Sequence, residues 1–179
     1  DMNGDGKIDG LDRIRPEKNQ EPRFVAGLTL TAKWKGFDLM MLWQGATGAE
    51  VYIETWSGLV GNFLKSDYDK RWTPENPSNI YPKATTNRAL LVSDRFIEDG
   101  SYLKLKTLSL SYSFPKINLK HIQGLRLYVT GQNLLTWTKY RGYDPEVSYR
   151  GASTLEAGED FGGYPQSRTF MFGIKLDIK

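Results

Sequence analysis

The chain has 179 residues, 13% of them aromatic, with 24 Lys and Arg against 21 Asp and Glu, one His and no Cys. The balanced charge is spread along the chain and gives no sign of a nucleic-acid-binding face, and the lack of Cys excludes a disulfide framework and a thiolate metal site. No run of about eighteen apolar residues occurs, so the sequence predicts no transmembrane helix.

The first predicted element is a metal-binding loop, DMNGDGKIDGLD, at residues 1–12. Its oxygen-bearing side chains have the spacing of an EF-hand calcium loop, and Gly6 permits the sharp turn that such a loop needs. The following RIRPEKNQEPRF is not a helical sequence, so we expect the loop without the helices of a complete EF-hand. The predicted ligands of one structural Ca²⁺ are Asp1, Asn3, Asp5, the backbone carbonyl of Lys7, Asp9 and Asp12. The alternative is a turn rich in Asp, Asn and Gly that binds no metal.

Residues 24–34 and 37–45 are predicted to form a β-hairpin. In FVAGLTLTAKW, apolar and mostly polar residues alternate with a period of two, as they do in a strand with one apolar face. Lys35 and Gly36 supply a tight turn between the two strands. The second strand, FDLMMLWQG, places on one face Phe37, Leu39, Met41 and Trp43.

Three further strands are predicted near residues 101–114, 125–134 and 168–178. The last, TFMFGIKLDIK, is the clearest, since Phe, Ile and Leu occupy every second position. In SYLKLKTLSLSYSF, the first two Leu residues are out of phase with the later apolar positions. We expect a β-bulge near Lys106 to reconcile them.

The predicted connections alternate between short and long: residues 35–36, about 46–100, 115–124 and about 137–167. Most connections in compact soluble domains run about four to six residues, whereas an outer-membrane β-barrel has short periplasmic turns and long extracellular loops. The pattern therefore favours a transmembrane barrel over a soluble β-sandwich, whose strands also alternate. About eight strands are the fewest that commonly close a barrel, and residue 1 is Asp rather than Met. We therefore expect the last five strands of a longer chain.

In such a barrel, the apolar side of each strand faces lipid and aromatic residues lie at the two membrane–water interfaces. The residues expected in a periplasmic aromatic girdle are Trp34, Phe37, Tyr112 and Phe114. Those expected to face lipid are Leu28, Leu30, Leu110, Leu127, Phe172 and Ile174.

Several stretches of the sequence resemble the C-terminal part of the SusC/RagA family of TonB-dependent outer-membrane transporters, and they follow the order found in that family. They are DMNGDGKIDGLD, KGFDLMMLWQG, RWTPENP, SDRFIEDGSYLKLKTLSLSYSFP, LRLYVTGQNLLTWTKYRGYDPEVS and YPQSRTFMFGIKL. The resemblance implies an all-β chain, the final five antiparallel strands of a barrel of about 22 strands, whose N-terminal plug lies outside this sequence. It also implies that the chain is not an enzyme but part of an importer of oligosaccharides or peptides.

The same resemblance implies a location in the bacterial outer membrane and a set of partners. Members take energy from TonB through their N-terminal region, and a SusD-like surface lipoprotein covers the extracellular mouth. The other neighbours would be membrane lipid and the rest of the transporter chain, and no nucleic acid. Residues 1–23 would form an extracellular segment with the calcium loop, and residues 24–179 would belong to the barrel. The alternative function is that of a secreted, calcium-bound β-sandwich that binds carbohydrate.

Few residues outside the calcium loop suggest chemistry. The acid pairs Glu98-Asp99 and Glu159-Asp160 are adjacent in sequence and lack the spacing that glycoside hydrolysis requires, so no catalytic residue is predicted. A helix is expected within residues 58–72, ending before Thr73-Pro74. Aromatic residues in or beside the long connections would pack the loops or stack on sugar rings; they are Trp56, Trp72, Tyr81, Trp137, Tyr140, Tyr143, Tyr149 and Tyr164.

Overall fold

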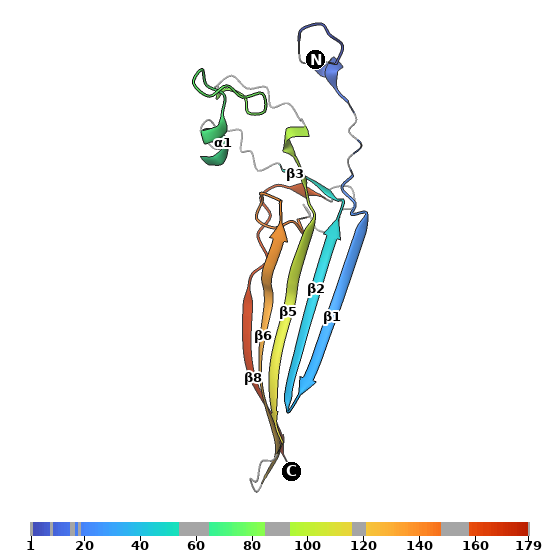
Figure 1. Ribbon diagram of the computed structural model, residues 1–179, viewed down its shortest axis with the longest axis vertical. Coiled ribbons are helices and arrows are strands. Elements are labelled where there is room, and N and C mark those ends of the chain that lie inside the picture. The colour runs from blue at the N-terminus through green and yellow to red at the C-terminus, as the bar shows by residue number, and fades with distance from the viewer. Residues whose placement is uncertain are drawn as a thin grey trace.

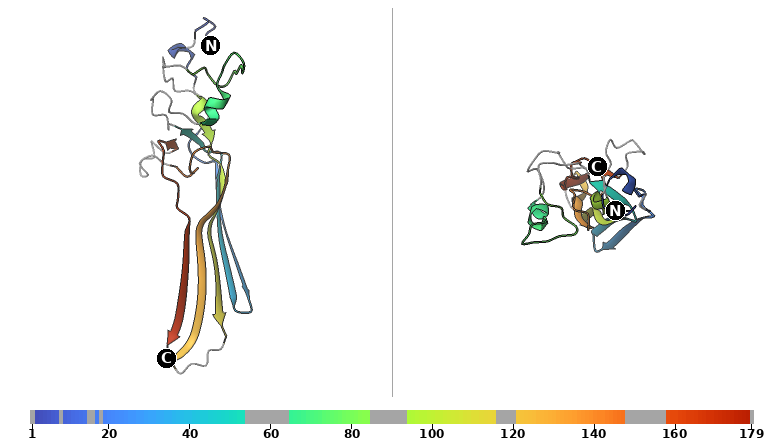
Figure 2. Two further views of the ribbon diagram at one scale, coloured as in Figure 1. Left: turned by 90° about the vertical axis from the view of Figure 1, so that its left-hand side faces the viewer. Right: turned by 90° about the horizontal axis from the view of Figure 1, so that it is seen from above.

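A single sheet of five long antiparallel strands dominates the computed structural model, which describes residues 2–7, 9–14, 17, 19–53, 65–84, 94–115, 121–147 and 158–178. In sheet order the strands are β1 (Phe24–Trp34), β2 (Phe37–Thr47), β5 (Tyr102–Phe114), β6 (Ile122–Thr138) and β8 (Thr169–Ile178). The sheet is tall and bent, and the long connections gather at one end of it (Figures 1 and 2). The strands lie close to the predicted ranges, although β6 begins three residues earlier and ends four residues later.

The shorter elements lie in the long connections and in the N-terminal segment. They are η1 (Gly10–Asp12), β3 (Glu50–Ile53), α1 (Lys65–Lys70), η2 (Asp94–Phe96), β4 (Ile97–Asp99) and β7 (Glu159–Asp160). Strands β4, β3 and β7 form a second, small sheet at the loop end of the large one. Of the helix expected within residues 58–72, α1 supplies the later part, and residues 58–64 lie outside the described residues. None of the helices in the described ranges is long and apolar enough to cross a membrane.

The turn between β1 and β2 depends on left-handed backbone conformations. Lys35 has φ 45° and Gly36 has φ 89°, which is the pattern of a two-residue hairpin turn that fits the strand twist. The turn also packs against β5, because Ser113 N donates to Gly36 O at 2.8 Å. A Cβ on Gly36 would lie 2.8 Å from Ser113 O, so both the conformation and the close approach require glycine.

The register of the sheet aligns the apolar positions of all five strands on one face. Leu110 lies opposite Leu39 on one side and Val129 on the other, and Val129 lies opposite Phe172. The predicted bulge is confirmed, since the pairing passes from Leu105 to Thr107 and leaves Lys106 out of the ladder. The extra residue brings the two halves of β5 into phase.

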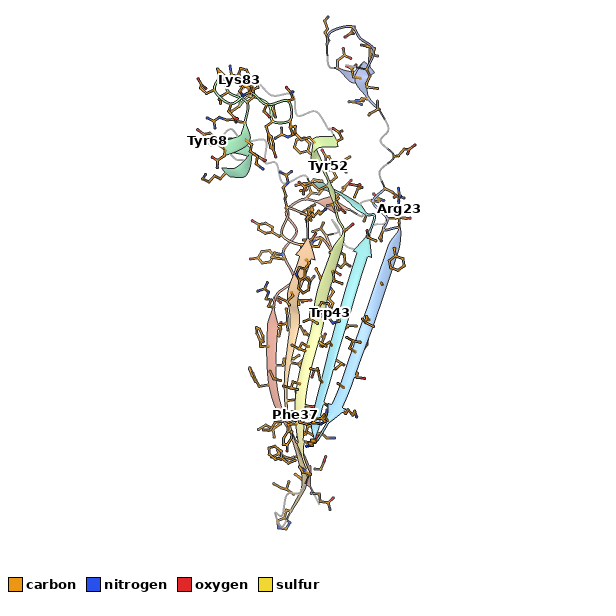
Figure 3. All side chains as sticks on the ribbon, in the orientation of Figure 1. Arg23, Phe37, Trp43, Tyr52, Tyr68 and Lys83 are labelled. Atoms are coloured by element: carbon orange, nitrogen blue, oxygen red, sulfur yellow. The ribbon has the colours of Figure 1, made fainter. Side chains whose placement is uncertain are left out.

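Aromatic side chains mark both ends of this apolar face. Near the short turns, the ring of Tyr112 lies 4.6 Å from that of Phe37 and 4.8 Å from that of Phe114. Near the loops, the rings of Trp43 and Trp137 stack at 5.7 Å. Figure 3 labels Phe37 at the short-turn end and Trp43 farther toward the loops.

The opposite face of the sheet is polar and hydrogen-bonded across the strands. Asp38 lies opposite Lys33 on one side and Ser111 on the other, and Arg126 lies opposite Ser113 and Lys175. Arg126 reaches diagonally across the strands: its Nη2 lies 3.0 Å from an Asp38 carboxylate oxygen, and its Nε donates to Ser111 Oγ at 3.0 Å. The polar side chains therefore find partners within the sheet itself.

The apolar face is not covered by a second sheet in the part of the chain that the structure describes. Leu28 is 55% exposed and Phe172 is 81% exposed, although a β-sandwich would bury such residues against a facing sheet. The few buried apolar residues among those described are Val51, Leu105 and Tyr140, which lie toward the loop end. The arrangement disfavours the sandwich alternative.

Candidate functional site at the base of the long loops

Three segments that are far apart in the sequence meet at the loop end of the large sheet. Glu50 N donates to Asn19 O at 2.8 Å, which ties the N-terminal segment to β3. Tyr52 N donates to Gly158 O at 2.8 Å, and β3 pairs in parallel with β7 beyond that point. We call this region the loop base and define it by residues 19–23, 48–53, 97–101, 139–147 and 158–163.

The strongest polar contacts beneath the loop base form a group that we call the anchor cluster: Lys104, Lys106, Asp144 and Glu146. Lys104 Nζ lies 2.5 Å from Asp144 Oδ1 and 2.5 Å from Glu146 Oε2. Lys106 Nζ lies 2.5 Å from the same Glu146 oxygen. Lys104 is only 1% exposed and Asp144 only 8%. Lys106 and Glu146 are partly exposed, and the two positive and two negative charges neutralise one another.

Local structure explains why these side chains meet. Lys104 lies on the polar face of β5, opposite Gln44 and Thr136, and the bulge at Lys106 adds a second ammonium group at the same level. The connection after β6 folds over that face and presents Asp144 and Glu146, which flank Pro145.

Every carboxylate oxygen of the anchor cluster has a hydrogen-bond donor. Besides the lysine, Asp144 Oδ1 accepts from Glu146 N at 2.9 Å, and Asp144 Oδ2 accepts from Gln166 N at 3.3 Å. The Tyr102 hydroxyl donates to Glu146 Oε1 at 3.1 Å. The backbone bond from Gln166 also draws the return segment toward β8 into the same contact.

The electrostatics keep both acids ionised. Burial raises the pKa of Asp144, but the hydrogen bonds from Lys104 and from the Glu146 backbone outweigh it, and the net pKa is lowered. Burial also raises the pKa of Glu146, but the hydrogen bonds and charges of Lys104 and Lys106 outweigh this effect, and the net pKa is lowered. Both acids are paired with lysines and accept further hydrogen bonds from the protein itself. These contacts tie residues 144–146 to β5, which indicates a structural role for the anchor cluster.

Two further contacts brace the loop base. The Tyr140 hydroxyl donates to Asp160, which also accepts at one oxygen from Gly162 N at 2.8 Å and Gly163 N at 2.9 Å. Burial, and then the hydrogen bond to Asp160, raise the pKa of Tyr140. Arg141 pairs through its side chain with Glu98, and its Nη1 lies 3.5 Å from an Asp67 oxygen in α1. Glu98 and Asp160, each from an adjacent acid pair, thus serve in bracing contacts.

The predicted calcium loop lies apart from the loop base, at the far end of the N-terminal segment (Figure 1). Asp12 closes it by accepting from Met2 N at 2.7 Å and from Asp9 N at 2.7 Å, and these backbone bonds lower the pKa of Asp12. Asp5 accepts from Lys7 N at 2.8 Å, and Asn3 accepts from Asp5 N at 3.0 Å.

Not all of the predicted calcium ligands can be placed. Asn3, Asp5, Lys7, Asp9 and Asp12 belong to the described residues, and Asp1 lies outside them. Among the described residues, no group of three or more His, Cys, Asp or Glu side chains is arranged to hold a metal ion. The Asn3 side chain and the Lys7 carbonyl offer two further oxygen donors of the kind that calcium prefers.

Some aromatic residues of the long loops pack against other residues, and others are exposed. Tyr140 is buried, Trp137 stacks on Trp43, and the ring of Tyr81 lies beneath Lys70 and Arg95. Tyr143 and Tyr164 are exposed at the edge of the loop base. Trp56 and Tyr149 lie outside the described residues.

Sequence reasoning did not identify the anchor cluster. One signal was available in the pattern of β5, where two Lys interrupt a strand otherwise made of apolar and hydroxyl residues. The matching acids flank Pro145 in the connection that follows β6. Nothing local to either segment, however, indicates that they meet across about forty residues of sequence.

Comparison with known proteins shows which proteins this chain resembles. No family model matches the chain. The chain is 34% identical to the TonB-dependent receptor P3 of Formosa agariphila over 186 residues, which are 98% of this chain and 18% of that protein. It is 27% identical to the TonB-dependent receptor SusC of Bacteroides thetaiotaomicron over 182 residues, 99% of this chain and 17% of that protein.

Solved structures agree with these relatives. The RagAB peptide transporter matches with a TM-score of 0.73 and 26% identity over 91% of this chain and 18% of the solved chain. The 'open-open' state of the RagAB peptide importer matches with a TM-score of 0.71 and 28% identity over 90% of this chain. TonB-dependent receptors are outer-membrane transport proteins and not enzymes. The expected resemblance is confirmed: this chain is a segment homologous to the SusC/RagA family of TonB-dependent receptors and spans about 18% of their length.

Proposed function

We propose that this chain forms the last five strands of the barrel wall, of about 22 strands, in a TonB-dependent outer-membrane transporter. The observation that carries the proposal is the apolar face, which is continuous across five paired strands and exposed, with a polar face behind it. In the described part of the chain, β1 and β8 each pair on one side only, which suits strands that have further neighbours in a closed wall.

The height of the apolar face suits a bilayer. Strand β1 has 11 residues from Phe24 to Trp34, a length of about 33 Å at about 3.3 Å per residue. At a strand tilt of about 40°, this length gives a band about 25 Å tall, which is the height typical of transmembrane barrels. Aromatic rings at both ends of the face would lie at the two interfaces.

The lengths of the connections give the proposed orientation. The short turns would face the periplasm, and the loop base with residues 1–23 would lie outside the cell. The anchor cluster would then hold the connection between β6 and β8 against the lumen side of the wall.

We infer that the whole transporter imports peptides or oligosaccharides with a SusD-like lipoprotein as a lid. The support comes from the relatives: RagAB is described as a peptide importer that has open and closed states. A partner of this kind would approach the loop base, where Tyr143 and Tyr164 are exposed. TonB would act through the part of the transporter that lies outside this chain.

An arginine scan of β1 tests the proposal in the full-length transporter. Leu30→Arg, on the apolar face, should reduce the free energy of folding into lipid vesicles by about 2–4 kcal/mol, because it places a charge near the bilayer midplane. The matched variant Thr29→Arg, on the polar face of the same strand, should cost much less. Equal losses for the two variants would contradict the assignment of the faces.

We further propose that residues 1–12 bind one structural Ca²⁺ through Asp1, Asn3, Asp5, the Lys7 carbonyl, Asp9 and Asp12. The support is the spacing of oxygen donors and the closure of the loop by Asp12. An affinity of about 10⁻⁴–10⁻³ M would suffice outside the cell. No catalytic role is proposed for the ion.

Calorimetric titration with Ca²⁺ tests this site. Asp5→Ala should lower the affinity at least tenfold, since it removes a charged ligand, about 1.4 kcal/mol or more. Lys7→Ala should leave the affinity unchanged because residue 7 contributes its backbone only. Equal effects of the two substitutions, or no binding by the unsubstituted protein at millimolar Ca²⁺, would refute the site.

A further inference from the structure

We infer that Tyr128 and Gly173 set the register in which the last strand, β8, pairs with β6. The two residues lie directly opposite each other in the ladder. A Cβ on Gly173 would lie 2.1 Å from Cζ of Tyr128 and 2.5 Å from its Cε1. The tyrosine ring therefore occupies the space that any other side chain at position 173 would fill.

The pair lies on the polar face of the sheet. On this face β8 presents Thr169, Met171, Gly173, Lys175 and Asp177, and glycine is the only one of the five without a side chain. A glycine within a strand leaves a gap on the sheet surface, and the ring of a cross-strand aromatic residue fills such a gap. Tyr128 is 42% exposed, so its ring lies on the surface of the sheet and not in a core.

The apolar face does not by itself fix the register of β8. Every second residue from Phe170 to Ile178 is apolar. A shift of β8 by one residue would turn these side chains to the polar face, but a shift by two residues would only replace one apolar residue by the next. Asn133 Nδ2 donates to the backbone carbonyl of Ser167 at 3.1 Å, and a shifted strand would offer another carbonyl in its place. The side chains of the polar face must therefore decide between these registers.

The charges on the polar face favour a shifted register. Arg126 lies opposite Lys175 in the observed ladder, and like charges that lie directly opposite each other destabilise a strand pair. A shift of β8 by two residues would place Asp177 opposite Arg126 and Lys175 opposite Tyr128. The tyrosine ring opposes this shift because it lies where the Lys175 side chain would have to go. The pair of Tyr128 and Gly173 thus selects the observed register against the one that the charges favour.

Disulfide cross-linking in the full-length transporter tests the inference. This chain has no Cys, and Thr130 lies opposite Met171. Thr130→Cys combined with Met171→Cys reports the observed register, because a disulfide needs a Cα separation of about 4.4–6.8 Å and diagonal neighbours lie about 7–8 Å apart. Gln132→Cys combined with Met171→Cys, in a second protein, reports the shift by two residues. After folding into lipid vesicles, the first pair should cross-link in preference to the second.

Removing either member of the pair should shift the strand. Tyr128→Ala and Gly173→Val should each raise the yield of the shifted disulfide relative to the native one about fivefold, as expected for the loss of a strong cross-strand pair. Valine suits a strand better than glycine does, so a loss of the native register in Gly173→Val would run against its strand propensity. Tyr128→Phe should keep the native ratio because the ring and not the hydroxyl fills the gap.

The double variant separates a matched pair from two independent effects. Once Tyr128→Ala has removed the ring, adding Gly173→Val should change the ratio no further, whereas independent effects would multiply. If Gly173→Val alone does not fold, adding Tyr128→Ala should restore folding. Multiplying effects, a failure to restore folding, or an unchanged ratio in both single variants would overturn the inference.

Gly27→Val is the matched control on the other edge strand, β1. Gly27 also lies on the polar face, opposite Gln44, but the nearest atom to its added Cβ is Trp43 O at 3.8 Å. This variant should fold and should keep the native ratio of disulfides. The cross-links report how β6 and β8 pair, whereas Leu30→Arg and Thr29→Arg report which face meets lipid, so the two proposals can fail separately.

Discussion

The wall and the loop base invert the usual rule of protein burial. In the wall, large apolar side chains such as Leu28 and Phe172 are exposed, whereas Asp144 and Asp160 at the loop base, and Lys104 just beneath it, are buried. A soluble domain does the reverse. The difference teaches that the wall depends on an apolar environment supplied from outside the chain, while the loop base depends on complete pairing of its own charges.

The largest effect that tests this difference between the wall and the loop base should come from removing one charge from the anchor cluster. Lys104→Met should destabilise the packed loop by about 3–5 kcal/mol, because it leaves the buried Asp144 and the partly buried Glu146 with a single remaining cation. Hydrogen exchange in residues 139–147 of the full-length transporter measures this loss, while exchange in the middle of β1 should not change.

A matched surface variant supplies the control. Lys65 forms an exposed pair with Asp69 in α1, at 2.5 Å, and Lys65→Met should cost less than about 1 kcal/mol. If Lys104→Met cost no more than Lys65→Met, the anchor cluster would not hold the loop.

The wall has its own point of failure at the first turn. Gly36→Ala should cost about 1–2 kcal/mol, because an alanine in a left-handed conformation is strained and its Cβ would lie 2.8 Å from Ser113 O. Gly27→Ala is the control: Gly27 has no positive φ, and the nearest atom to its added Cβ is Trp43 O at 3.8 Å. Urea unfolding midpoints of the two variants in lipid vesicles measure the difference, and a reversed order would contradict the turn assignment.

Mild acid should destabilise the loop at residues 139–147 but not the five strands, and this is the smallest of the expected effects. The pKa values of Asp144 and Glu146 are lowered from ordinary values of 3.8 and 4.5, so their pairing stabilises the folded loop fully above those values. This stability is lost as the pH falls through the lower pKa values of the folded state. Hydrogen exchange, corrected for its intrinsic pH dependence, should show residues 139–147 unchanged between about pH 7 and pH 5 and opening below about pH 4. Simultaneous loss of protection in the five strands would remove the contrast.

The wall could be predicted from the sequence because its signals are local. A period of two identifies each strand, and the phase change between Leu105 and Leu108 was enough to locate the bulge at Lys106. The long ends of β6 were missed, since Gly124 and the residues around Trp137 do not continue the clear alternation.

The loop base could not be predicted in the same way. Lys104 and Asp144 are separated by forty residues, and their contact depends on how one connection folds over the polar face. Their burial also runs against the expectation that charged residues are exposed. The charges of these residues are compatible with such a cluster, but the sequence alone does not show which lysines and acids come into contact, since that depends on the tertiary structure.

The one-sided pairing of β1 and β8 has a practical consequence for handling this polypeptide alone. Each of these strands leaves a row of backbone donors and acceptors without a neighbouring strand in the described chain, and such rows recruit strands from other molecules. Expressed by itself in water, the polypeptide should self-associate strand to strand and accumulate as an aggregate, with its apolar side chains adding to the attraction. Recovery in a native form would then require the remaining strands and a detergent or lipid environment from the start of folding.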